Sequence, residues 1–144
     1  MQTVSPQELE ARVEARYRVF LILWVALFIS VMLFLALAVA FGSKGSPNLA
    51  LSYGLLSFGL TMAVVSFVLK QQLVRKAIDK NDIAALQSAH IVSLALCEST
   101  ALFGLLDRFA TASNTGWFLF AISAAGMLLH FPKKDHVRAV SFKQ

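Results

Sequence analysis

The stretch "VFLILWVALFISVMLFLALAVAF", residues 19–41, runs through the first part of the chain without a charged side chain. About 20 consecutive apolar residues allow a helix to cross the hydrocarbon core of a bilayer, so this stretch is long enough for one span. It is also longer than the apolar part of a secretory signal, which covers about 7–15 residues. We therefore expect a membrane-spanning helix that is retained rather than a signal that is removed.

Three more apolar stretches follow, and the composition agrees with them. Hydrophobic residues make up 58% of the chain, and its mean hydropathy is +0.69, whereas soluble domains are roughly 45–50% apolar. The Gly-, Ser- and Asn-rich segments 42–48 and 110–116 are typical of the tight turns that join antiparallel helices. We predict a single all-α integral membrane domain over residues 1–144, an antiparallel up-and-down bundle of four transmembrane helices at about 19–41, 49–69, 83–106 and 111–131.

The basic residues predict an orientation. There are 13 Lys and Arg against 8 Asp and Glu, an excess that would suggest nucleic acid in a soluble protein. Here they lie in the N-terminal arm, in residues 70–82 and in the tail, whereas the two other loops hold only Lys44 and Arg108. Both termini and the central loop are therefore predicted on the cytoplasmic side of a bacterial inner membrane or its organellar equivalent, with the bilayer as partner and no nucleic acid. Arg108 is expected to pair with Asp107 or to meet lipid head groups.

A helical pattern begins before the first span. Apolar residues recur at helical spacing from Leu9 to Phe20, and Pro6 suits the first position of a helix. We predict an amphipathic N-terminal helical extension that lies on the membrane surface or against a partner. Residues 70–82 are expected to form a loop, and the tail with His136 is expected to be solvated.

"ALCESTALFGLL", residues 95–106, places one carboxylic acid, Glu98, in the third predicted span. If that span enters near Gln87, Glu98 lies about 16 Å deep, near the middle of a core about 30 Å thick. A charge there costs on the order of 2.5–3.5 kcal/mol by insertion scales. We expect Glu98 to be uncharged, bound to no metal and hydrogen-bonded to a neighbouring helix. The alternative is a proton- or ion-carrying site formed with Ser99 and Thr100.

The same segment, residues 95–106, resembles the carboxylate-bearing helix of the c subunit, or proteolipid, of rotary ATP synthases. In that family the acid is followed by a hydrophobic-aromatic-Gly-Leu sequence, and Glu98 followed by "LFGL" at 102–105 keeps this order. Ser99 matches the serine of sodium-binding members, but Phe103 stands where those members have a tyrosine. The glycine-rich first helix and the Arg-Gln/Asn-Pro loop of the family are absent. The resemblance is local, and it implies proton rather than sodium transfer at Glu98.

Small residues share one face of the second predicted span. Ala50, Gly54, Ser57 and Thr61 follow one another at spacings of three or four residues. Because lipid supplies no hydrophobic force between helices, small side chains that allow backbones to approach favour association. We predict helix packing through Gly54, Ser57 and Thr61, with an ion path along this face as the alternative.

Two histidines are predicted near the cytoplasmic edge. His90 lies near the start of the third span and His130 near the end of the fourth. Neutral imidazoles at similar depth can ligate haem or chlorophyll if their faces meet. The alternative is that both are ordinary interfacial residues with one wet edge.

No catalytic or metal-binding pattern accompanies these residues, so the chain is not expected to be an enzyme by itself. The single cysteine, Cys97, excludes an intrachain disulfide. Three functions remain. The first is a structural or accessory subunit of a larger membrane complex, with other membrane subunits or further copies of the chain as partners. The alternatives are a proton-translocating protein that uses Glu98 and a haem- or chlorophyll-binding subunit that uses His90 or His130.

Overall fold

The computed structural model describes residues 6–42, 46–111 and 113–141. These residues form five α-helices and no strand, so the all-α prediction is confirmed. In chain order the helices are α1 (Pro6–Ala40), α2 (Leu49–Asp79), α3 (Ile83–Thr111), α4 (Thr115–Leu129) and α5 (Lys134–Ser141).

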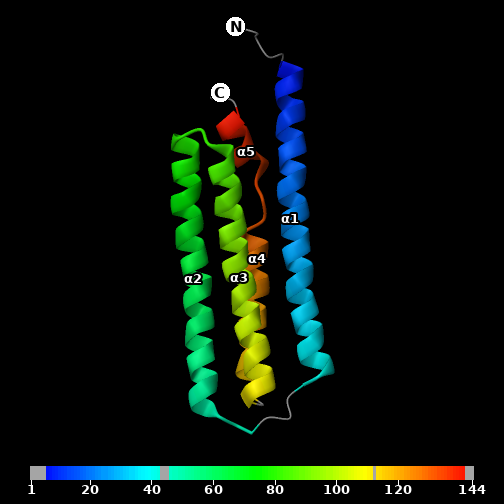
Figure 1. Cartoon of the computed structure of the whole chain (residues 1–144), viewed down its shortest axis with the longest axis vertical. Coiled ribbons are helices and arrows are strands. Elements are labelled where there is room, and N and C mark those ends of the chain that lie inside the picture. The colour runs from blue at the N-terminus through cyan, green and yellow to red at the C-terminus, as the bar shows by residue number, and fades with distance from the viewer. Residues whose placement is uncertain (1–5, 43–45, 112, 142–144) are drawn as a thin grey trace.

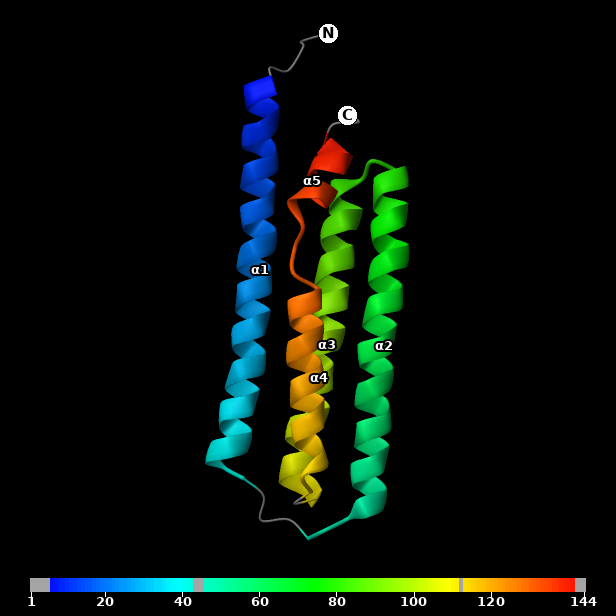
Figure 2. The same ribbon diagram turned by 180° about the vertical axis from the view of Figure 1, so that it is seen from behind.

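Four helices stand side by side and alternate in direction (Figure 1, Figure 2). The short helix α5 lies at the end of the bundle where both chain termini are found. Helix α3 contacts every other helix, whereas α1 contacts α3, α4 and α5 but, among the described residues, not α2. Helix α3 is therefore the centre of the bundle, and α1 is held on one side of it.

Helices α1, α2 and α3 are each long and apolar enough to cross a membrane. Helix α4 has 15 residues and extends about 22 Å, short of a hydrocarbon core about 30 Å thick. It is followed by α5 after a break, and the two helices are bent by 48° relative to each other. Pro132 lies in this break and lacks the N–H that a continuing helix needs. The described residues thus hold three candidate spans, or four if α4 and α5 count as one.

The predicted central loop is mostly helix. Helix α2 continues to Asp79, so only Lys80 to Asp82 turn the chain. Asn81 in this turn has a φ of 52°, in the left-handed region that asparagine enters more readily than most residues. Asp82 then accepts a hydrogen bond from the N–H of Ala85 at 3.0 Å, which caps the start of α3. The loop prediction is wrong because apolar residues continue at helical spacing between the basic ones.

A hydrophobic core fills the basic end of the bundle. Helix α1 begins at Pro6 as predicted, but the apolar face of its first turns packs against α5 and the other helices. The prediction that this face meets the membrane surface or a partner is therefore wrong. The buried members of this core are Val13, Phe20, Val74, Ala77, Leu86, Ala89, Val137 and Val140.

The C-terminal tail forms α5 and is held on α1 by ion pairs. Lys134 pairs with Glu14, and Arg138 Nη2 lies 2.8 Å from Glu10 Oε1. His136 of α5 is half-buried, and its ring centroid lies 6.4 Å from that of His90 in α3. The expectation of a solvated tail is wrong because two valines, three residues apart, give α5 an apolar face.

A second core closes the middle of the bundle. Trp24 of α1 donates its indole N–H to the carbonyl oxygen of Met127 in α4 at 2.8 Å. The backbones of α3 and α4 meet at Gly104 and Gly116, where neither position has room for a Cβ atom. The buried apolar members of this core are Val31, Ala38, Leu94, Cys97, Ala101, Phe120 and Met127.

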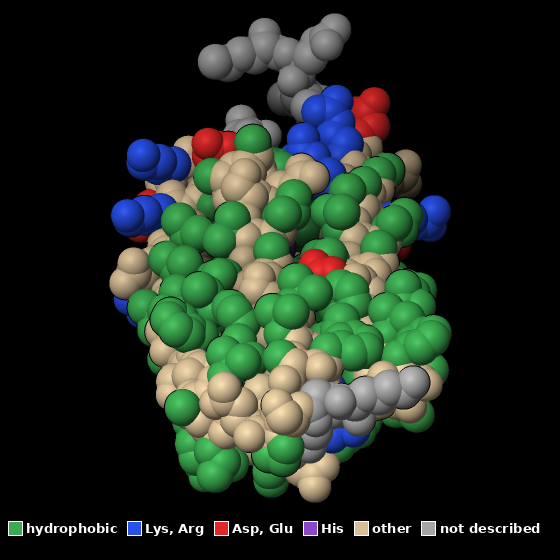
Figure 3. All heavy atoms as spheres, turned by 60° about the horizontal axis from the view of Figure 1, so that its bottom comes forward, with side chains coloured by type: hydrophobic (Ala, Val, Ile, Leu, Met, Phe, Trp, Pro, Cys, Tyr) green, Lys and Arg blue, Asp and Glu red, His purple; other side chains and the backbone are tan. Residues whose placement is uncertain are grey.

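The surface has an apolar middle and a basic end. Hydrophobic side chains cover the middle of the face in Figure 3, and Lys and Arg side chains gather towards its upper end. Large apolar side chains such as Ile22 and Leu129 are more than 60% exposed. An apolar band of this kind is unfavourable in water and compatible with a lipid surrounding.

Candidate functional site

Glu98 lies in the middle of α3 and faces α1. The Ser30 hydroxyl of α1 donates a hydrogen bond to Glu98 Oε1, and the Glu98 side chain is half-buried. Ser30 carries the only hydroxyl in the uncharged stretch 19–41. That isolated polar atom is the signal in the sequence that identifies the partner. The pair joins α1 to α3 in the part of the bundle that is otherwise apolar.

Ser99 and Thr100 do not join Glu98 in one site. Successive residues of a helix point about 100° apart. The Ser99 hydroxyl donates to a carbonyl oxygen of its own helix at 2.9 Å. Thr100 is buried and donates to the carbonyl oxygen of Gly59 in α2 at 3.1 Å. Within the described residues Ser30 is the one hydrogen-bond partner of Glu98, so the chain alone assembles a helix contact rather than a polar path.

His90 and His130 are buried at the basic end of the bundle. The ring centroid of His90 is 5.0 Å from that of Phe20, and the centroid of His130 is 4.5 Å from that of Phe67. His130 Nε2 also lies 3.2 Å from Ser66 Oγ. A haem or chlorophyll bound through either imidazole would have to displace these neighbours. Among the residues that the structure describes, no group of three or more His, Cys, Asp or Glu side chains is placed to hold a metal ion.

Hydroxyl groups tie α2, α3 and α4 together beside His130. Ser66 Oγ of α2 lies 3.4 Å from Cys97 Sγ of α3. Ser123 of α4 donates to the carbonyl oxygen of Cys97 at 2.6 Å. Interhelical hydrogen bonds of this kind supply polar partners inside an apolar bundle. These side chains therefore hold the helices in register and leave Cys97 fully buried.

Asp107 is a buried carboxylate that the sequence did not single out. Its side chain is 0% exposed and accepts hydrogen bonds from Thr111 at 2.7 Å and from Thr115 at 2.6 Å. Ser52 of α2 bonds to Thr115 in turn. The N-cap residue of α4, Asn114, makes no capping bond with its side chain. Asp107 of α3 therefore fixes the start of α4 from outside that helix. A negative charge near the N-terminus of a helix is also stabilised by the helix dipole.

Arg108 does not pair with Asp107, so that part of the expectation is wrong, whereas its alternative, a contact with lipid head groups, stays a prediction. Its Nη1 donates to the carbonyl oxygen of Ser113 at 2.8 Å. Its guanidinium carbon lies 4.7 Å from the centroid of the Trp117 ring, within the range of a cation–π contact. Arg108 thus closes the turn between α3 and α4.

The small-residue face of α2 points away from the bundle. A Cβ atom on Gly54 would meet nothing within 4 Å, and Ser57 and Thr61 are exposed. Their hydroxyls donate to carbonyl oxygens one turn back, each at 2.8 Å. We call Ala50, Gly54, Ser57 and Thr61 the outer α2 face; its packing against another helix stays a prediction. The buried residues of α2 lie on the opposite side and are Ser52, Gly59, Ala63, Ser66, Val74 and Ala77.

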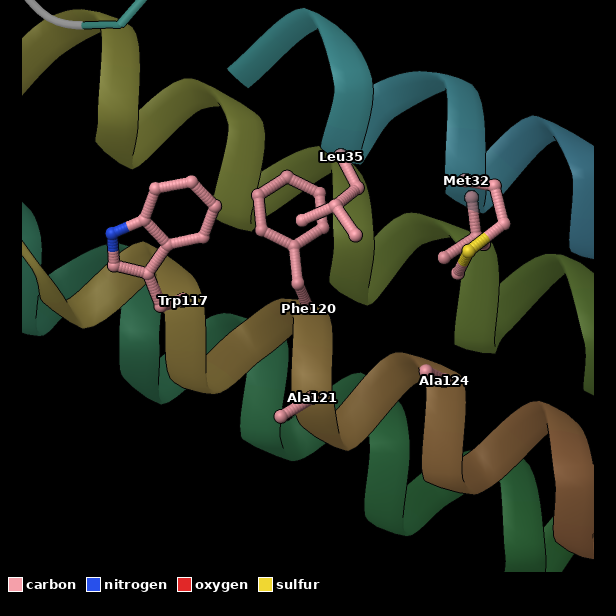
Figure 4. A pocket seen from close by; sticks show the side chains of 7 residues that line it. Met32, Leu35, Trp117, Phe120, Ala121 and Ala124 are labelled. Carbon is pink, nitrogen blue, oxygen red and sulfur yellow. The ribbon is translucent and has the colours of Figure 1, made fainter. Parts of the chain in front are cut away.

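An apolar groove of about 240 Å³ lies between α1 and α4. Figure 4 shows Phe120 of α4 close to Leu35 of α1, while the small side chains of Ala121 and Ala124 leave space beside them. Its lining carries no charged side chain. The groove therefore offers no group that would bind and orient a charged ligand.

No family model, curated protein or solved structure matches the chain. The contacts of its own side chains therefore carry the functional argument. Two features stand out: the outer α2 face, which no described part of the chain covers, and the Ser30–Glu98 pair in the middle of the bundle.

Proposed function

We propose that the protein is a four-span membrane protein that serves as a structural subunit of a larger membrane assembly. In this proposal α1, α2 and α3 each cross the bilayer, and the fourth span, at about 111–131, is built on α4 and ends before α5. Both termini lie on the cytoplasmic side of a bacterial inner membrane or its organellar equivalent. The gathering of Lys and Arg at that end supports this orientation.

The outer α2 face carries the proposal. It combines a glycine that has open space beside it with two short hydroxyl side chains. In lipid, such a face lets a second helix approach closely and gain van der Waals contact. A partner helix from another membrane subunit, or from a second copy of this chain, is the occupant that we propose.

The polar groups inside the bundle support a structural role. Ser66, Thr100 and Ser123 each bond across to another helix. Each of these groups is used to hold one helix to the next. No catalytic role is proposed for any of them.

The substitution Gly54→Leu tests the proposal. Because a Cβ atom on Gly54 would meet no described side chain or neighbouring helix within 4 Å, leucine should leave the single chain folded and obstruct only a helix from outside. The matched control is Ala36→Leu, which enlarges an exposed small residue of α1. Each protein is extracted from its native membrane in mild detergent, separated by native electrophoresis, and its companions are identified by mass spectrometry.

The wild type and Ala36→Leu are expected to co-purify with a defined set of membrane subunits or as a homo-oligomer. Gly54→Leu is expected to lose that assembly while keeping its helical circular dichroism. The proposal fails if the wild type is extracted as a single chain, or if Gly54→Leu assembles as well as the control.

A second candidate function, proton translocation, rests on Glu98. The observation that favours it is a half-buried carboxyl group at mid-helix whose partner is one neutral hydroxyl. Glu98→Gln keeps a hydrogen-bond acceptor but has no proton to release. In reconstituted vesicles with a pH-sensitive dye, the wild type should pass protons and Glu98→Gln should not. Equal flux in both proteins, or none above empty vesicles, would exclude this function.

A further inference from the structure

A groove with basic side chains opens between α2 and α5. It has a volume of about 460 Å³. Helix α2 supplies one side of it and α5 the other, and the α2 residues follow one another at spacings that keep them on one helical face. The lining residues are Lys70, Gln71, Val74, Arg75, Ile78 and His136.

Among the residues that the structure describes, no acidic side chain forms an ion pair with the basic side chains of this groove. The ion pairs among the described residues use Glu10 and Glu14 of α1 and involve neither Lys70 nor Arg75. Lys133 lies close enough to Lys70 for the two charges to repel each other. No acidic side chain lines the groove. The site therefore has a charge that an anion would balance.

One acid acts on the α5 side of the groove. Burial, Lys70 and Lys133 lower the pKa of His136, whereas the negative charge of the neighbouring Asp135 raises it. Because Asp135 is exposed and is not among the lining residues, it does not occupy the groove.

The position of Lys70 indicates the depth of the groove. Lys70 directly follows the uncharged residues 49–69 of α2. In the topology proposed above, it therefore lies at the cytoplasmic boundary of the bilayer, where the phosphates of lipid head groups are found. Arg75 is one turn farther from the membrane and has a guanidinium that can bind two phosphate oxygens at once.

We propose that this groove binds a phosphate group, carried by an anionic phospholipid or by a free phosphorylated solute, through Lys70 and Arg75. Basic pockets between helices at the cytoplasmic boundary are suited to lipid phosphates. The apolar side chains of Val74 and Ile78 line the same groove and suit the less polar part of a phosphate ester. The lipid source rests on the proposed membrane topology, whereas the binding of phosphate does not.

The test compares two double variants with the same loss of charge. Lys70→Gln/Arg75→Gln removes both basic groups of the groove. Lys76→Gln/Lys80→Gln removes two from a separate groove between α2 and α3 and serves as the control. Each full-length protein is reconstituted with phosphatidylglycerol and phosphatidylcholine of identical acyl chains, checked for insertion by flotation, and analysed for retained lipid by native mass spectrometry.

The wild type and the control are expected to retain phosphatidylglycerol in preference to phosphatidylcholine. The groove variant is expected to bind phosphatidylglycerol about 30-fold more weakly, because each Lys or Arg near an anionic surface contributes about a factor of five. Glycerol 3-phosphate and inorganic phosphate are then added to the wild type. If they displace the lipid, or bind without lipid and depend on the same two residues, the source is a soluble phosphate; if they do not, it is a lipid.

Equal retention by the wild type and both variants would overturn the proposal, and so would a wild type with no preference for the anionic lipid. Failure in the flotation step would count against the proposed membrane topology. In that case, the binding of glycerol 3-phosphate and inorganic phosphate to the protein in detergent tests whether the groove binds phosphate. Arg75→Lys keeps the positive charge and is a milder change, so it serves as a check in case the double variant misfolds. It should bind phosphatidylglycerol more strongly than Lys70→Gln/Arg75→Gln.

Discussion

Gly104 of α3 and Gly116 of α4 face each other at a point where the two backbones touch. A Cβ atom on Gly104 would lie 2.9 Å from the carbonyl oxygen of Gly116, and one on Gly116 would lie 2.6 Å from the carbonyl oxygen of Gly104. Both distances are shorter than real Cβ contacts. The contact sets how closely the short helix α4 can lie on α3, and it places Asp107 and Thr115 within hydrogen-bond distance.

Gly116→Ala should destabilise the protein. The added methyl group meets a backbone carbonyl oxygen of α3, which cannot rotate away as a side chain can. Overpacking of this kind costs about 1–3 kcal/mol of unfolding free energy. Unfolding in detergent micelles, followed by circular dichroism, measures the loss. Gly54→Ala is the matched control, because it meets open space and should stabilise its helix by about 0.5–1 kcal/mol; equal effects of the two substitutions would contradict the close contact.

Ser30→Ala should weaken the attachment of α1 to α3. The substitution removes the one hydroxyl that donates to Glu98, and interhelical hydrogen bonds in membrane proteins average about 0.6 kcal/mol with a maximum near 1.7. Ser57→Ala is the control, since its hydroxyl bonds only to its own helix. A double-mutant cycle measures the interaction energy between the two side chains. It compares the unfolding free energies of the wild type, Ser30→Ala, Glu98→Ala and the double variant. A coupling of zero would show that the pair does not hold the helices together.

The sequence was sufficient to predict the helical class and the position of α1, because an uncharged apolar stretch as long as residues 19–41 is typical of a spanning helix. It also located the small residues of the outer α2 face, whose packing against another helix stays a prediction. It did not predict that α2 continues to Asp79 or that the tail folds back as α5. Lys and Arg among apolar residues suit both a loop and a solvated helix face. The two are distinguished by the burial of Val74 and Ala77 of α2, and of Val137 and Val140 of α5, in one core.

The candidate site was predictable in part for the same reason. Glu98 stands out as an isolated acid in an apolar run, so the sequence alone draws attention to it. Its partner Ser30 is distant in the chain. Which face of α1 meets α3 depends on the rotation of α1 about its own axis, and the sequence does not specify that rotation. The sequence suggested Asp107 only as a partner of Arg108, because adjacent opposite charges suggest a pair. The helix geometry instead directs the two side chains to different neighbours.

Asp107→Asn should loosen the start of α4. An amide has one oxygen to offer, so Thr111 and Thr115 can no longer both donate to the side chain as they do to the carboxylate. Thr111 can still donate to the main-chain carbonyl oxygen of Asp107, so the loss falls on the bond from Thr115, and a hydrogen bond to a charged group contributes about 1.5–3 kcal/mol to the unfolding free energy. Hydrogen exchange of the first α4 amides should rise together with that loss. Asp79→Asn, at an exposed site of α2, is the control; the assignment is wrong if both variants unfold alike.

The docking of α5 on α1 should depend on pH through Glu14. The hydrogen bond and the charge of Lys134 hold the pKa of the Glu14 carboxyl below its usual range, and Arg18 adds to this effect. A carboxyl whose pKa is lowered by folding stabilises the fold above its unfolded pKa, about 4.3, and loses that contribution as the pH falls through the folded value. Burial lowers the pKa of His136, which also disfavours the fold in acid, so the comparison must isolate Glu14. The unfolding temperature of the wild type should therefore exceed that of Glu14→Gln at pH 6, and the difference should shrink towards zero near pH 3. A difference that persists unchanged at pH 3 would mean that the ionised carboxylate does not hold α5 in place.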